Sequence, residues 1–177
     1  MDISDYQGLD GDLLREKIHA LNRPQLDEQI RQFGGQHALL CQRLEALYSP
    51  DRIDQFMVIR PGGLEEIDKA IGLAANNPKE LSLLKSFREL NRVLLPFMDV
   101  YEERVLQDLT YMSKEELEAM YTGVTAHMAS AEKLQKEHPE DHRQAQNATG
   151  TLRLAALMKE GIRKELKERF GTDAEPE

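Results

Sequence analysis

Residues 78–109, PKELSLLKSFRELNRVLLPFMDVYEERVLQDL, are the stretch that decides the fold. Asn77, Pro78 and Glu80 together form a helix start signal. Asn77 supplies a capping side chain, Pro78 lacks the backbone N–H that would have no partner in the first turn, and Glu80 places an acid near the positive end of the helix. Pro96 removes a backbone hydrogen bond, but the apolar pattern keeps its phase beyond it, which predicts a kink and not an end. The apolar residues recur at steps of three and four and therefore share one helix face: Leu83, Phe87, Leu90, Leu94, Met98, Tyr101, Val105 and Leu109. The sequence predicts a long, kinked central helix over 78–109.

The other helices follow from similar patterns and end signals. Ser113 and Glu116 have the spacing of a capping box, which predicts a helix start at 113. Residues 55–60 suit a helix or a single strand, and helix is favoured because no second strand is available for pairing. Further helices are predicted over 12–21, 24–47, 64–75, 113–138 and 140–170. The expected fold is all-α: an elongated bundle of six to seven helices, with a long C-terminal helix over 140–170.

Composition sets limits on domain number and location. With 177 residues the chain suits one domain, 1–171, followed by a disordered acidic tail, 172–177. Its one cysteine, Cys41, excludes an internal disulfide and fits a buried packing role. The N-terminus has no signal-peptide pattern and no window resembles a membrane span, so we expect a cytoplasmic protein. The net charge of −9 opposes non-specific attraction to nucleic acid and anionic lipid.

A seam of apolar residues and one histidine runs along the predicted helix 24–47. Gly34 and Gly35 lie inside it without changing its phase, as either a flexible joint or a site where another backbone packs closely, and close packing is favoured. The steps of four and three resemble three coiled-coil heptads. Intrachain packing would use most of these residues, but they are also the best interface candidates: Leu26, Ile30, Phe33, His37, Leu40, Leu44 and Leu47.

A basic C-terminal helix suggests one alternative function. Residues 151–170 carry a net charge of +3 on a chain whose remaining residues sum to −12. Four of its cations are candidates for contacts with nucleic-acid phosphates: Arg153, Lys159, Arg163 and Lys167. Interspersed glutamates at i,i+3 and i,i+4 favour ordinary surface ion pairs instead.

Two histidines suggest a second alternative, a metal-dependent hydrolase. His138 and His142 stand four residues apart with carboxylates between them, but they match neither H-E-x-x-H nor H-x-x-E-H. Pro139 also places His138 at or before the helix start, so a solvated helix start is the favoured interpretation. No motif for a nucleophile or a phosphate loop is present in the sequence, and we expect no cofactor.

These patterns favour a non-enzymatic module for protein–protein interaction: an adaptor, regulator or inhibitor that binds a partner protein through an amphipathic helical face. Seven methionines favour adaptable apolar contacts, and the acidic body would steer the chain toward a basic partner surface. The same kind of face also allows a homodimer.

Overall fold

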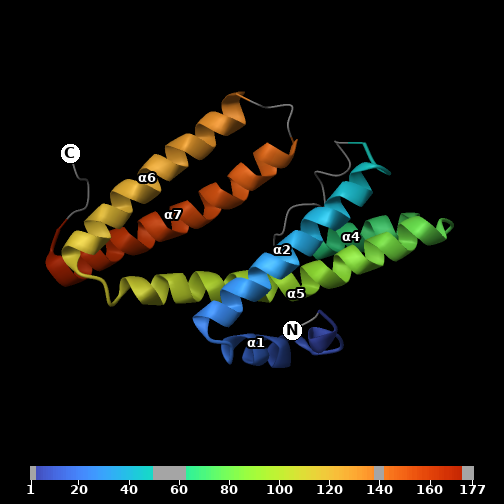
Figure 1. Ribbon diagram of the computed structural model, residues 1–177, viewed down its shortest axis with the longest axis horizontal. Helices are drawn as coiled ribbons and strands as arrows, with labels where there is room; N and C mark the ends of the chain where they lie inside the picture. Colours follow the sequence, from blue (N-terminus) through green and yellow to red (C-terminus); the bar gives the residue numbers. More distant parts are fainter. Residues whose placement is uncertain (1–2, 50–62, 138–141, 173–177) are drawn as a thin grey trace. The chain divides into compact units, whose positions relative to one another are not determined.

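The computed structural model describes residues 3–49, 63–137 and 142–172, and of residues 142–150 it describes the backbone alone. Regular structure in these ranges is entirely helical (Figure 1), which confirms the predicted all-α bundle. None of the described helices is long and apolar enough to cross a membrane. The elements are a 3-10 helix, η1 (Ile3–Tyr6), and six α-helices: α1 (Gly11–His19), α2 (Arg23–Glu45), α4 (Gly63–Leu73), α5 (Pro78–Leu109), α6 (Lys114–Glu137) and α7 (His142–Phe170).

The chain divides into two compact units, residues 1–101 and 102–177. Helix α5 runs from the first unit into the second, and its bounds are those that the sequence predicts. At its start, the Glu80 N–H donates to Oδ1 of Asn77 at 3.3 Å, and Nδ2 of Asn77 donates to the Glu80 carboxylate at 3.1 Å. Pro96 lies inside the helix, which continues past it as predicted.

The other helix ends lie within two residues of the predicted ones, and the end of α7 at Phe170 is the predicted one. Helix α1 begins after Asp10, whose carboxylate accepts from the Leu13 N–H at 2.9 Å. Helix α2 begins after Asn22, which forms a reciprocal capping box with Gln25 that the sequence interpretation missed. Residues 55–60, for which helix and strand were both considered, lie outside the described residues. The same holds for residues 173–177 of the predicted tail.

The first unit has two apolar clusters along α5. One joins η1, α1 and α2 to residues 90–101 of α5, and it is centred on Tyr6, Phe33 and Phe97. The other joins α2 and α4 to the first turns of α5 around Phe87. Because α1, α2 and α4 all pack against α5, α5 is the scaffold of this unit.

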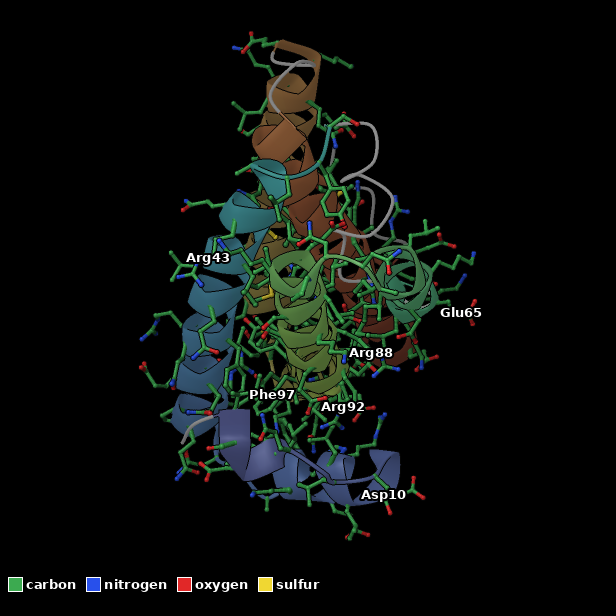
Figure 2. All side chains as sticks on the ribbon, turned by 90° about the vertical axis from the view of Figure 1, so that its right-hand side faces the viewer. Asp10, Arg43, Glu65, Arg88, Arg92 and Phe97 are labelled. Atoms are coloured by element: carbon green, nitrogen blue, oxygen red, sulfur yellow. The ribbon has the colours of Figure 1, made fainter. Side chains whose placement is uncertain are left out.

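Arg92 fastens the N-terminal segment to α5. Its guanidinium donates to the carbonyl oxygens of Tyr6 and Leu9, both at 3.0 Å, and forms an ion pair with Glu89. Figure 2 shows Arg92 and Phe97 on the part of α5 that lies beside α1. Tyr6 is the last residue of η1 and Leu9 lies between η1 and α1, so Arg92 provides hydrogen-bond donors for carbonyl oxygens at and beyond the end of this short helix.

The expectation of close packing at Gly34 and Gly35 is wrong. Both lie inside the continuous helix α2, both are exposed, and a Cβ added at either would meet nothing within 4 Å. They therefore make no close contact that requires the absence of a side chain.

Replacing Gly34 by alanine should consequently raise the free energy of unfolding by about 0.5–1 kcal/mol, because alanine loses less backbone entropy in a helix. Denaturant unfolding of the wild type and Gly34→Ala measures this gain when the free energy of unfolding depends equally steeply on denaturant concentration in both proteins. A loss of stability would mean that α2 bends at this position or meets another surface there.

Candidate interaction groove

The second unit is built on a hairpin of α6 and α7, and α6 starts at the predicted capping box. The Ser113 N–H donates to the Glu116 carboxylate at 2.8 Å, and the Glu116 N–H donates to Oγ of Ser113 at 3.2 Å. Hydrogen bonding of the Glu116 carboxylate with Ser113, first with its backbone N–H and then with its side chain, holds the pKa of Glu116 below its ordinary value. Met112 packs against the cluster that contains Leu117, as a hydrophobic staple would. Local sequence alone thus determines where α6 begins.

One face of the hairpin is closed by its own core. Leu117 and Tyr121 from α6 pack with Ile162 and Leu166 from α7 and with Leu109 at the end of α5. A side chain at Gly161 would lie 2.7 Å from Cδ2 of Leu106 and 2.9 Å from Cδ1 of Leu109, so glycine permits close packing of α7 against α5. The sequence interpretation gave no role to Gly161.

Arg169 and Gly171 hold the end of α7. Arg169 donates to the carbonyl oxygen of Leu109, the last residue of α5, at 3.3 Å and to that of Met112, which precedes α6, at 2.8 Å. Gly171 has φ 65°, and its N–H donates to the Lys167 carbonyl at 3.1 Å, which is the geometry of a left-handed C-terminal cap. Thr172, the first residue of the predicted tail, donates its N–H to the Leu166 carbonyl at 3.3 Å, and the disorder of the tail stays a prediction.

An open groove of about 790 Å³ lies along the hairpin between α6 and α7. Its lining is mostly apolar, and three of its residues are methionines, whose flexible side chains adapt to differently shaped apolar surfaces. The described residues of this hairpin leave that apolar surface without a covering element. The lining comprises Met112, Glu116, Ala119, Met120, Gly123, Val124, His127, Thr151, Leu154, Ala155 and Met158.

Charge in the groove is confined to α6. Glu116 and His127 are the ionisable residues of the lining and stand eleven residues apart, about 16 Å along a helix. The α7 side contributes Thr151 and three apolar residues. An occupant would therefore need mainly apolar surface, with charged groups only near the two ends.

The structure places the seam predicted as an interface mostly in the first unit's own core. Leu26, Phe33 and Leu44 are fully buried, Ile30 and Leu40 are partly buried against the same clusters, and the ring of His37 lies 5.0 Å from that of Phe87. Leu47, beyond the end of α2, is 53% exposed. The seam thus serves intrachain packing, and an interface role for it stays a prediction.

The four cations proposed for nucleic acid lie on α7, and three of them have partners within the second unit. Arg153 forms an ion pair with Glu102 at 3.2 Å, and Arg163 donates to the Tyr121 hydroxyl at 3.1 Å. The Lys159 ammonium lies 5.0 Å from the centre of the Tyr121 ring. Lys167 also has an interaction within the protein. A role in binding phosphates stays a prediction.

The predicted metal site cannot be placed: His138 and the side chain of His142 lie outside the described residues. Among the side chains that are described, no group of three or more His, Cys, Asp or Glu could hold a metal ion.

Met120, Val124, Ala155 and Met158 have the helical spacing of apolar helix faces, but the sequence interpretation did not predict that they line a groove. Periodicity identifies a face that needs a partner, but it does not reveal whether the chain supplies one. The small residues Ala119 and Gly123 beside these methionines were the available signal.

Comparisons with protein-family models, curated proteins and solved structures found no match to this chain.

Proposed function

We propose that this protein is a non-enzymatic protein–protein interaction module that binds an amphipathic helix in the groove between α6 and α7. The observation that supports this most directly is the apolar, methionine-lined groove of about 790 Å³. Helix-in-groove recognition uses apolar anchors at i, i+3, i+4 and i+7, and a groove between two helices offers the matching ridged surface.

The polar groups of the groove favour a helix over a small polar substrate. Small-molecule sites usually combine apolar walls with several convergent polar groups. Here the Glu116 carboxylate already accepts the Ser113 N–H, and His127 lies eleven residues away. A helix of about 16 Å or longer can reach both groups.

A displayed library of helix-forming peptides of about 18 residues tests this function. Peptides selected on the wild type should carry apolar residues at helical spacing. They should bind Gly123→Glu at least tenfold more weakly, because a carboxylate then stands on the apolar surface.

Gly34→Glu is the matched control, since both glycines are exposed in helices and a Cβ at either meets nothing within 4 Å. Binding to this control should equal that of the wild type, and unfolding curves should show that both variants fold. Equal binding to all three proteins, or failure to select any peptide at protein concentrations where the protein is monomeric, would exclude the groove as a helix-binding site.

A further inference from the structure

The surface that α6 presents to the groove is complementary to itself. Six lining residues belong to α6, and they fall into three pairs placed symmetrically about the midpoint between Tyr121 and Thr122. Each pair joins unlike side chains. Glu116 is paired with His127, Ala119 with Val124, and Met120 with Gly123.

This pattern matters because of how a two-fold axis relates two antiparallel helices. Across such an axis, residue i of one copy faces residue j of the other, and j faces i. An axis at the midpoint between Tyr121 and Thr122 would place the acid opposite the histidine, and the smaller residue of each apolar pair opposite the larger one. Large side chains facing small ones are what ridges-into-grooves packing requires.

We infer that the helix bound in the groove is α6 of a second copy, so that two α6–α7 hairpins form an antiparallel four-helix arrangement. This inference rests on the proposed function and identifies its partner. Met120 of each copy fills the space above Gly123 of the other, where a Cβ would meet nothing within 4 Å. Glu116 of each copy lies beside His127 of the other.

The electrostatic requirements are compatible with this dimer. The net charge of −9 per chain repels a second copy at long range, but physiological salt screens such repulsion beyond about 8 Å. Opposite His127, the dimer places Glu116 of the second copy, and the described lining residues of α7 around it are uncharged.

Mixed cysteine cross-linking of the full-length chain tests the arrangement itself. In a Cys41→Ala background, Glu116→Cys and His127→Cys are purified separately, then oxidised alone and after mixing. Only the mixture should give a disulfide-linked dimer, because equivalent positions of the two copies lie about 16 Å apart, beyond the reach of about 7 Å for a disulfide.

Sedimentation velocity over a concentration series provides the second readout. Wild type and Gly34→Glu should reach the same dimer fraction, whereas Gly123→Glu should weaken the dimer at least tenfold. Glu116→Gln retains an oxygen for the cap at Ser113 but removes the carboxylate charge opposite His127, so it should weaken the dimer. A dimer that is insensitive to Gly123→Glu, or that gives no mixed cross-link, would overturn the inference.

A monomer at every concentration would also overturn it, and the peptide library then decides the fate of the proposed function. If selected peptides still bind in a manner that depends on Gly123, the groove binds a different helix and the proposed function stands. If they do not, both proposals are wrong.

Discussion

Replacing Phe33 by alanine should lower the free energy of unfolding by about 3–5 kcal/mol, because it removes a large, fully buried ring and leaves a cavity. Phe33 from α2 lies edge-to-face with Tyr6 at 5.8 Å and with Phe97 of α5 at 5.4 Å, and Tyr6 and Phe97 are 5.3 Å apart. Each such pair contributes about 0.5–1.5 kcal/mol beyond burial. One substitution therefore weakens the contacts of α2 with both η1 and α5.

Leu39→Ala is the matched control, since Leu39 lies on the same helix but is 56% exposed. Its substitution should change the free energy of unfolding by no more than about 0.5 kcal/mol. Urea unfolding of the three proteins measures both values. Similar losses for Phe33→Ala and Leu39→Ala would show that the aromatic cluster does not hold this unit together.

The sequence predicts best what adjacent residues determine. The bounds of α5 are correct because Asn77 and Glu80 mark its start and one apolar phase runs to Leu109. The start of α6 is correct because the Ser113 box depends on groups only three residues apart. In both cases the deciding hydrogen bonds are local, so their partners can be identified from the sequence.

The spacing of apolar residues does not predict contacts between segments that are far apart in the sequence. Tyr6 lies in an acidic segment whose helix has four residues, too few for an apolar pattern, yet it is fully buried. Arg92 has no role in the sequence interpretation, but its guanidinium donates to carbonyl oxygens 83 and 86 residues away. The groove is missed for the same reason: the sequence identifies apolar faces but not which of them remain uncovered.

His37 makes the stability of the first unit depend on pH. Its ring lies against Phe87, and Nδ1 lies 3.5 Å from Sγ of Cys41. Burial lowers the pKa of His37 from 6.5 to about 4, and a hydrogen bond with Asn91 opposes this shift. The native state thus holds His37 neutral at pH values where a histidine in the unfolded chain accepts a proton.

Lowering the pH from 7 to 4 should therefore destabilise the wild type through His37, because protons bind preferentially to the unfolded state. The loss begins near pH 6.5 and approaches about 3 kcal/mol at pH 4, since each unit of pKa difference corresponds to about 1.4 kcal/mol. Unfolding of the wild type and His37→Gln at a series of pH values isolates this effect. Asp68 and Glu89, whose pKa values their arginine partners lower, titrate in both proteins and cancel in the difference. A constant difference across this range would contradict the prediction, since it would mean that native His37 accepts a proton as readily as the unfolded chain does.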